Sequence, residues 1–446
     1  GMVALQAGNH RGGSMSFDSV LPPSYAKRVE LNDEVHARPP EILTAPCRVS
    51  QLALLPNADE ARDAPWAALC ALSQRFSVPP PAPGANHYSA DFGPFRLKWE
   101  RHGEFSRFMV VVAGEEPEPF GAAAIHALPA DWLKSLPGQV IAAAHVSLLA
   151  SKEVPLAISE ISRRYFRDHM LVGGPLAGGQ AHAFTDFRIH GDGFSRFLIF
   201  DGGMSPYQAG RLTQRLLEME TYRIMALLAL PVAQEVAPQI GTQERELAEI
   251  SAALVEAQEA DEPLLLQRLT RMAAEAESRE SRHRFRFSAA AAYYELVRNR
   301  IQELRELRME GMQTFGEFTE RRLAPAMNTC KAVATRQEML SQRVARATQL
   351  LSTRVDITRE RQNQALLASM ERRARQQLRL QQAVEGFSVA AITYYVVGLV
   401  AYLAKGLVAS GFALRDELVT GIAIPIVALA VALGVRRFRR RMADHD

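Results

Sequence analysis

Hydrophobic residues recur at helical spacing over a long stretch in the C-terminal part of the chain. Residues 326–385 contain no Gly or Pro, and their Leu, Val and Met side chains return every three or four positions among Arg, Gln and Glu. This pattern predicts one uninterrupted stalk helix. If the helix continues to Ala404, its length is on the order of 115 Å, because each residue adds about 1.5 Å.

Two apolar runs follow the predicted stalk. Residues 386–404 carry no charge and are long enough to cross a bilayer as a first transmembrane helix. Residues 405–418 form a short polar loop, residues 419–435 are the second apolar run, and residues 436–446 are a basic tail. The sequence therefore predicts a C-terminal transmembrane hairpin, with a hairpin buried in a soluble protein as the alternative.

Charges beside the two runs predict their orientation. Arginines flank the runs on the stalk side and on the tail side, at Arg372, Arg373, Arg375, Arg379, Arg436, Arg437, Arg439, Arg440 and Arg441. The loop between the runs has no net positive charge, since Asp416 and Glu417 balance Lys405 and Arg415. Because basic segments stay in the cytoplasm, both termini are expected there and the loop is expected outside.

The N-terminal part, residues 21–204, has the pattern of an α+β cytoplasmic domain with an antiparallel sheet. The predicted strands are 45–55 and 140–149, and the predicted helices lie near 61–76, 129–135 and 158–169. Residues 1–20 lack the apolar core of a signal peptide, and we expect them to be disordered or left over from cloning.

An internal echo links residues 88–112 to residues 180–200. Each reads as a strand, a His-Gly-acidic turn and a Phe-Ser-Arg-Phe run that enters another strand. The matched residues are His102, Glu104, Ser106 and Arg107 in the first segment and His190, Asp192, Ser195 and Arg196 in the second. The echo predicts two equivalent β-hairpins. A hydrolase is disfavoured because the serines have no nucleophile-elbow context, so no catalytic residue is predicted and the protein is not expected to be an enzyme.

Two motifs that resemble ligand sites are interpreted as turns. Residues 173–179 are rich in Gly but lack the Gly-Lys-Ser/Thr of a phosphate loop. The segment 28–40 holds Asn32, Asp33, Glu34 and His36, which could form a metal or catalytic cluster. A turn that starts a helix and ends at two prolines is the favoured interpretation.

Residues 205–325 form a predicted helical region. Ser205 and Pro206 stand in capping positions of a helix that is expected to stop at Pro231. An acidic helix at 242–260 and an Arg-containing helix from about 264 to 307 are expected to pair antiparallel beside the stalk. The acidic face is expected to be solvated, with cation sensing as the alternative.

Composition limits the possible partners. The formal charge of +3 is too small to indicate a nucleic-acid-binding protein. The three cysteines, Cys47, Cys70 and Cys330, lie far apart without metal-ligand spacing, which suits a reducing compartment.

Three stretches, residues 31–40, 185–197 and 362–406, resemble an uncharacterised bacterial family described as membrane-anchored, with a domain of unknown function. The resemblance covers about residues 21–441. It implies a location in the bacterial inner membrane and brings no activity with it.

The order of parts also resembles the CorA-type magnesium channels, which are homopentamers with long helices around an axial pore. That resemblance implies a CorA-like architecture, a homo-oligomer and a divalent cation as ligand; no other cofactor is indicated. The signature Gly-Met-Asn of those channels is missing, and Ala404, Lys405, Gly406 and Leu407 stand in its place.

If the first span lines a pore, its most polar face supplies the lining. The pore-lining candidates are Gln381, Glu385, Ser388, Ile392, Tyr395, Leu399 and Tyr402. A ring of Glu385 would concentrate cations, Ile392 and Leu399 would form an apolar gate, and Asp416 and Glu417 in the outer loop would attract cations. The alternative is that these residues pack helices or face lipid. Metal ligands stay unknown at this level.

The sequence thus leads to two hypotheses. The first is a CorA-like homo-oligomeric inner-membrane ion channel or transporter for cations, with a regulatory cytoplasmic domain. The alternative is a non-conducting membrane-anchored sensor or scaffold whose cytoplasmic domain binds a partner or ligand.

Overall fold

The computed structural model describes residues 24–443 apart from 30, 33–38, 115 and 410–415. The chain divides into two compact units: Gly1–Glu249 with Arg271–Val344, and Ile250–Thr270 with Ala345–Asp446. The predictions for residues 1–20 and for Asp33, Glu34 and His36 lie outside the described residues.

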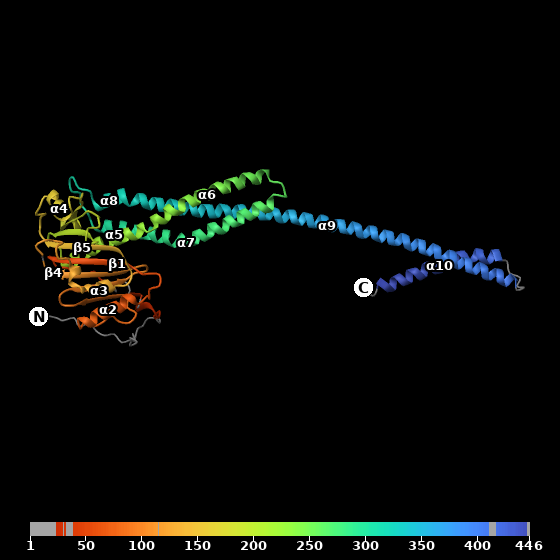
Figure 1. The fold of residues 1–446 in the computed structure, drawn as a ribbon, viewed down its shortest axis with the longest axis horizontal. Coiled ribbons are helices and arrows are strands. Elements are labelled where there is room, and N and C mark those ends of the chain that lie inside the picture. The colour runs from red at the N-terminus through yellow and green to blue at the C-terminus, as the bar shows by residue number, and fades with distance from the viewer. Residues whose placement is uncertain (1–23, 30, 33–38, 115, 410–415, 444–446) are drawn as a thin grey trace. The chain divides into compact units, whose positions relative to one another are not determined.

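An eight-stranded sheet forms the centre of the first unit (Figure 1). Its strands are β1 Cys47–Leu55, β2 His87–Asp91, β3 Arg96–Arg101, β4 Ser106–Ala113, β5 Gln139–Ala150, β6 Val172–Leu176, β7 Ala181–Thr185 and β8 Ser195–Asp201, in the order β2-β3-β4-β1-β5-β8-β7-β6. The predicted strands 45–55 and 140–149 correspond to β1 and β5. The α+β class is confirmed.

The prediction of a purely antiparallel sheet is wrong at one pair. β5 and β8 run parallel, with Ala144 opposite Ser195, while the other paired strands are antiparallel. Parallel neighbours need a long crossover, and here the chain passes through α4 (Ile158–Tyr165), β6 and β7 before it returns beside β5. The sheet is therefore mixed.

The two echoed segments form strand pairs of different kinds. β3 and β4 are joined by a tight turn, in which the His102 amide donates to the Phe105 carbonyl over 2.8 Å. β7 and β8 also pair antiparallel, but residues 186–194 separate them. β7 ends at Thr185, and Phe187 then adopts a left-handed backbone with φ 53°. The prediction of two equivalent hairpins is therefore wrong for the second segment.

Helices cover both faces of the sheet. On one face α2 (Ala64–Arg75) and α3 (Ala130–Ser135) enclose a core that includes Trp99, Phe108 and Trp132. On the other face lies α5 (Pro206–Leu227), whose Leu217 carbonyl and Thr221 hydroxyl accept hydrogen bonds from the buried Gln51 amide. A second core, around Ile161, Phe184 and Phe200, supports α4.

The glycine-rich segment is a strand in its first half, contrary to the predicted turn. Gly173 and Gly174 belong to β6, and Ala177–Gly179 is a short 3-10 turn. A Cβ on Gly173 would lie 1.9 Å from the Ala183 carbonyl oxygen, and Gly173 has φ 142°. Glycine is used here because the neighbouring strand approaches too closely for a side chain.

The helices begin and end partly as predicted. Ser205 caps α5 in a capping box with Gln208, as the Ser-Pro sequence indicated. α6 (Ala229–Glu256) starts well before the predicted position 242, because Pro231 lies in its first turn, where the amide that proline lacks needs no partner. α7 (Glu262–Glu303), α8 (Phe315–Arg322), α9 (Ala324–Ala409) and α10 (Asp416–Ala443) follow. α9 is uninterrupted over the predicted stalk.

Within the first unit, polar side chains of α6, α7 and the start of α9 contact one another, and Figure 1 shows these helices. Glu244 of α6 pairs with Arg336 of α9 over 2.5 Å, and Gln243 binds both Glu275 and Arg279 of α7. These contacts place Glu244, one of the acidic residues of the predicted pair, against an arginine.

Candidate metal centre

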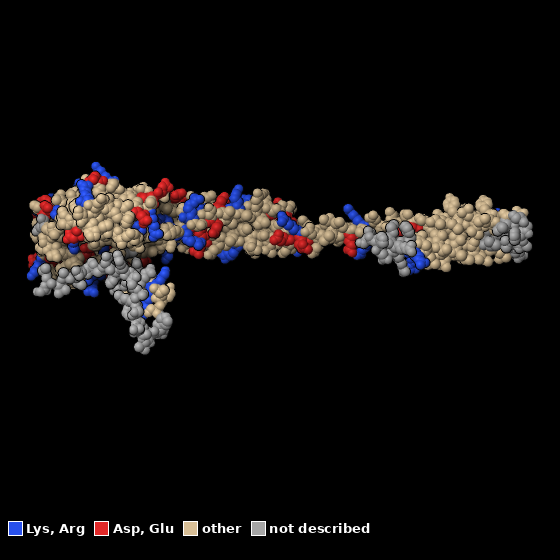
Figure 2. Space-filling model, turned by 90° about the horizontal axis from the view of Figure 1, so that it is seen from below, with Lys and Arg blue, Asp and Glu red and all other residues tan. Residues whose placement is uncertain are grey.

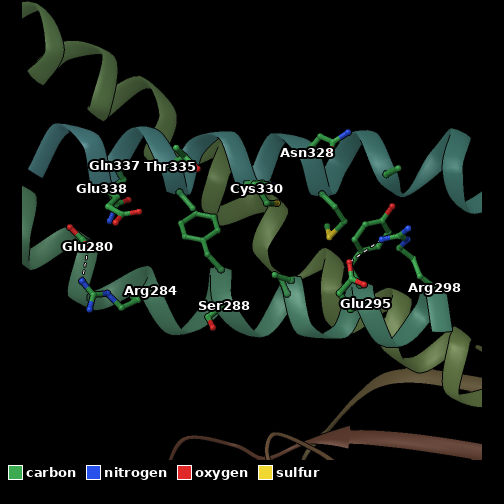
Figure 3. A pocket seen from close by; sticks show the side chains of 18 of the residues that line it. Glu280, Arg284, Ser288, Glu295, Arg298, Asn328, Cys330, Thr335, Gln337 and Glu338 are labelled. Carbon is green, nitrogen blue, oxygen red and sulfur yellow. Dashed lines mark hydrogen bonds and ion pairs between the residues drawn. The ribbon is translucent and has the colours of Figure 1, made fainter. Parts of the chain in front are cut away.

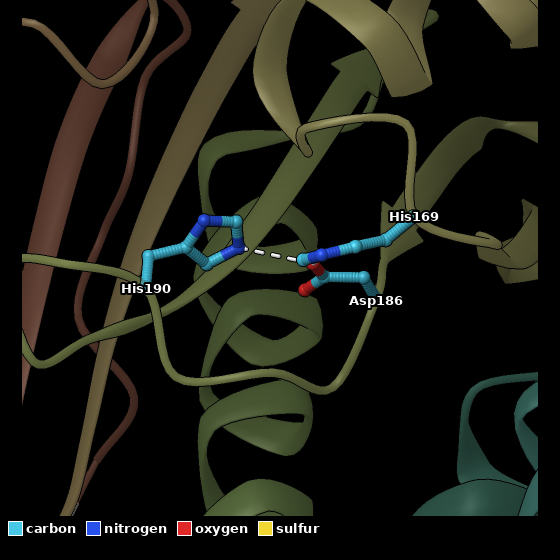
Figure 4. Close-up of side chains that lie close together, drawn as sticks. All are labelled: His169, Asp186 and His190. Atoms are coloured by element: carbon cyan, nitrogen blue, oxygen red, sulfur yellow. Dashed lines mark hydrogen bonds and ion pairs between the residues drawn. The ribbon is translucent and has the colours of Figure 1, made fainter.

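Three side chains of metal-ligand type converge at one end of the sheet (Figure 4). His169 lies in the loop after α4, Asp186 directly follows β7, and His190 lies in the loop that leads to β8. Their ligand atoms all lie within 4.8 Å of one another. We call these three residues the His-Asp-His cluster.

The Asp186 carboxylate stands between the two imidazoles. Its Oδ2 lies 2.7 Å from Nδ1 of His169 and 3.0 Å from Nε2 of His190. Its Oδ1 accepts the Arg188 amide at 3.2 Å, which turns the backbone and leaves Oδ2 for the histidines. The 3.0 Å separation is that of two metal ligands, because ligand bonds of about 2.0 to 2.2 Å hold ligand atoms about 3 to 3.5 Å apart. The 2.7 Å separation is that of the hydrogen bond between His169 and Asp186.

Two members of the cluster are completely shielded from solvent. The side chains of Asp186 and His190 are 0 % exposed, whereas His169 is 30 % exposed and opens the cluster to the surface. Burial lowers the pKa of His190, so its ring is neutral at pH 7 and can offer a lone pair. The cluster therefore provides a buried neutral imidazole at His190, a second imidazole at His169 and one carboxylate.

His190 makes a close and fully buried contact with Asp186. Its Nε2 lies 3.0 Å from the carboxylate, a contact that acts to raise the pKa of His190 against the larger effect of burial, and its Nδ1 has no hydrogen-bond partner among the described residues. A buried polar atom without a partner costs free energy, so native proteins seldom keep one without a purpose. The 3.0 Å between Nε2 and Oδ2 is also a separation that two ligands of one metal ion can have.

The backbone beside the cluster is held in an uncommon conformation. Arg167, Asp168 and Phe187 have φ of 56°, 59° and 53°, and each is a direct or near neighbour of a cluster residue. Left-handed backbone is uncommon for side chains other than Gly, and such strain gathers at functional sites. Local bonds maintain it: the Ser162 hydroxyl donates to the His169 carbonyl over 2.6 Å, and the His190 amide donates to the Phe194 carbonyl over 2.9 Å.

Sequence reasoning did not identify this cluster. His190 appeared only as a turn residue of the echo, and Asp186 and His169 were not singled out. The available signal was Asp186 four residues before His190 in a predicted turn; His169 lies 17 residues upstream of Asp186, and only the fold brings it near. The stretch 185–197, which carried part of the family resemblance, includes Asp186 and His190.

A family model described as "Protein of unknown function (DUF3422)" matches residues 23–442. The chain belongs to the DUF3422 family. No curated protein matches it. The match confirms an uncharacterised family, and the resemblance to CorA-type channels stays a prediction.

In this DUF3422 chain, the predicted pore residues lie on one helix in the second unit. Six of them are exposed on α9: Gln381, Ser388, Ile392, Tyr395, Leu399 and Tyr402. Glu385 is half-buried. Glu417, at the start of α10, is exposed, and the side chain of Asp416 lies outside those described. None of these residues belongs to the His-Asp-His cluster.

The C-terminal part of α9 and the helix α10 each have a half-buried face of mostly small residues and an exposed face of large apolar residues. The half-buried or buried residues on α9 include Val389, Thr393, Val397 and Ala404, and those on α10 are Ala423, Val427, Ala428, Val431 and Val435. The outer faces carry Phe387, Tyr394, Tyr395, Leu399, Tyr402, Ile422, Ile426, Leu429 and Leu433, all more than half exposed. Figure 2 shows the contrast between the charged surface of the first unit and this uncharged part. A water-soluble surface seldom exposes so many large apolar side chains together.

Within the part of the chain that the structure describes, two helical segments are long and apolar enough to cross a membrane, Pro206–Glu256 and Ala324–Gly406. This is weak support for membrane association, since core helices pass the same test. In the first segment Leu216, Leu217 and Met225 are buried in the α+β domain. The second segment contains the predicted first span, and little of its most apolar stretch is buried. The predicted second span, 419–435, lies within α10.

A groove of about 890 Å³ lies between α7 and α9 in the first unit (Figure 3). Phe287, Met327 and Cys330 contribute its apolar lining, and burial raises the pKa of the Cys330 thiol, which keeps it protonated. The charged groups Glu280 and Arg284 pair with each other along α7 over 2.5 Å. The groove therefore offers packing surface rather than a reactive group.

Proposed function

We propose that this chain is a membrane-anchored protein whose α+β domain binds a divalent transition-metal ion at His169, Asp186 and His190. The observation that carries this proposal is the convergence of the ligand atoms of the three side chains within 4.8 Å of one another, with Asp186 and His190 fully buried. A metal ion bound between them would be held by all three side chains at once. Among the two sequence hypotheses, this supports the sensor more than the channel.

The donor set narrows the choice of metal. Two imidazoles and one carboxylate form a three-ligand set that suits Zn²⁺ with an open fourth position, or Fe²⁺ in a facial triad. Mg²⁺ and Ca²⁺ prefer sites built from oxygen atoms. The partly exposed His169 leaves the open positions on the solvent side. The proposed ligand is therefore a transition-metal ion rather than magnesium.

Metal binding is tested by isothermal titration of full-length protein in detergent with Zn²⁺, and by visible absorption after Co²⁺ loading. We expect one ion per chain and loss of binding by at least tenfold in His169→Gln, the least buried ligand. His182→Gln, a half-buried histidine on β7 outside the cluster, is the matched control and should bind normally. Equal binding by both variants would disprove the site.

The exposed apolar faces of α9 and α10 support the anchoring part of the proposal. Neutral aromatic and aliphatic side chains such as Tyr394, Leu399 and Leu429 are stable in lipid and unfavourable in water. The expected result is a protein that stays in bacterial inner membranes after alkaline extraction. Release into the soluble fraction would contradict anchoring.

A cation channel is the second candidate function. It is favoured by the six exposed pore candidates on α9, which a homo-oligomer such as a pentamer could bring around one axis. The test is ion flux in proteoliposomes with Mg²⁺, Co²⁺, Ni²⁺, Zn²⁺, K⁺ and Cl⁻, comparing intact protein with Glu385→Ala. Absence of flux for every ion would end the channel hypothesis.

A further inference from the structure

Phe187 links the His-Asp-His cluster to the helices. It follows Asp186 directly, and its left-handed backbone, with φ 53°, turns the chain at the point where β7 ends. Only three residues separate Asp186 from His190. Because consecutive Cα atoms are about 3.8 Å apart, a shift of the Asp186 backbone has to be followed by Phe187.

The ring of Phe187 is enclosed by aromatic side chains from other elements. It stacks on Phe318 of α8 with ring centres 4.4 Å apart and an angle of 15°. It meets Phe315 of α8 and Phe197 of β8 edge-on, with ring centres 5.9 and 6.2 Å apart. The Arg223 guanidinium of α5 lies over the ring at 5.2 Å. Phe187 therefore connects the loop of the cluster to α8.

α8 is a short element that depends on such contacts. It has only eight residues, too few for a stable helix on its own. Its start is capped by Thr314 and Glu317, and the amides of Phe315 and Gly316 donate to Glu306, both over 2.9 Å. Its end, Arg322, is followed by Leu323 and then by the first residue of α9. α8 is thus the step between the α+β domain and the stalk helix.

We infer that metal binding at the His-Asp-His cluster stabilises the docked position of α8 through Phe187, so that metal occupancy is transmitted to the start of α9. This inference rests on the proposed metal site. The Asp186 to His169 distance of 2.7 Å is shorter than the separation of about 3 to 3.5 Å expected for two ligands of one ion, so loading changes the positions of these side chains. An ion that binds better to one position of the loop shifts α8 toward the matching position.

The test is hydrogen–deuterium exchange of residues 315–322 in full-length protein in detergent, with and without saturating Zn²⁺. Zinc should slow exchange of these amides by about tenfold, a typical strength for coupling between two sites. Phe318→Leu removes the stacked ring and should abolish most of this slowing of exchange by zinc. Phe285→Leu, a 66 % exposed phenylalanine on α7, is the matched control and should keep it.

Calorimetry on the same samples separates the two proposals. Two results would overturn the coupling and leave the metal site intact. One is zinc binding to the wild type without slower exchange, and the other is full slowing of exchange by zinc in Phe318→Leu. Absence of zinc binding would overturn both. Saturation of each variant, checked by calorimetry, ensures that a change in exchange reports coupling rather than affinity.

Discussion

Glu100 and Arg107 are cross-strand partners on β3 and β4, and both are almost completely buried. The Arg107 Nε donates to Glu100 over 2.9 Å, and Arg107 also lies 3.3 Å from Glu218 of α5. Lys98 and Arg300 extend the network, at 3.1 Å from Glu100 and 2.5 Å from Glu218. Burial acts to raise the pKa of Glu100, but Arg107 and Lys98 outweigh it and lower the pKa to about 2. The network joins the sheet to α5 and α7 through charges that must remain paired.

Removing the charge of Arg107 should therefore lower the stability of the fold strongly. Arg107→Met leaves Glu100 and Glu218 with less compensation in a buried place, and we expect a loss of about 3 to 5 kcal/mol of unfolding free energy. Urea unfolding followed by tryptophan fluorescence measures this loss, since Trp66, Trp99 and Trp132 all lie in the α+β domain. Arg164→Met, which breaks an exposed pair with Glu118, is the control and should change stability by less than about 1 kcal/mol. Similar losses in both variants would contradict the role of burial.

His145 should make the domain sensitive to mild acid. Burial lowers its pKa to about 4 from the usual 6.5, while its Nδ1 lies 2.8 Å from the Ser50 hydroxyl. Below pH 6.5 the unfolded chain takes up a proton that the folded chain does not, so stability falls as pH drops toward 4. The loss is on the order of 3 kcal/mol, because each pKa unit corresponds to about 1.4 kcal/mol.

Unfolding free energy measured at several pH values between 8 and 4 checks this expectation. His145→Gln keeps a polar group at the site and cannot be protonated, so its stability should depend less on pH over this range. The contribution of Glu100 appears only below its unfolded value of 4.5 and so does not mask the effect above that pH. An equal slope in the variant and the wild type would show that His145 is not the group responsible.

Replacing two helical glycines by alanine should change the stability of the fold in opposite directions. A Cβ on Gly210 of α5 would lie 1.7 Å from the Glu41 carbonyl oxygen, so Gly210→Ala must displace that segment and should cost about 1 to 3 kcal/mol. Gly241 of α6 has room, since the nearest atoms are arginine side-chain nitrogens at 4.0 Å. Gly241→Ala should stabilise by up to about 1 kcal/mol through helix propensity. Thermal unfolding of both variants provides the measurement, and a stabilised Gly210→Ala would contradict the close approach.

Membrane insertion should depend on position along α9. Leu399→Arg places a charge in the apolar run and should cost about 2.5 to 3.5 kcal/mol of insertion free energy. Leu366→Arg changes an equally exposed leucine of the same helix in its charged part and should have little effect. The two variants are compared by the fraction of protein that stays in the membrane after alkaline extraction. Retention of Leu399→Arg at the level of Leu366→Arg would show that this run does not enter lipid.

The sequence alone determined features that depend on neighbouring residues. The absence of Gly and Pro from 326 to 385 predicted the continuous α9, and Ser205 before Pro206 predicted the capped start of α5. The alternating and helical patterns predicted the α+β class. These signals are local, because hydrogen bonds within a helix and its cap join residues only a few positions apart.

Tertiary structure decided what depends on residues far apart in the chain. The parallel pairing of β5 with β8 follows from a crossover that strand patterns do not show, and Gly173 became part of a strand because β7 lies too close for a side chain. The His-Asp-His cluster formed because the loop after α4 and the loop after β7 meet, bringing His169 to 2.7 Å from Asp186. Such meetings depend on the packing of whole elements, and composition and spacing contain no direct record of it.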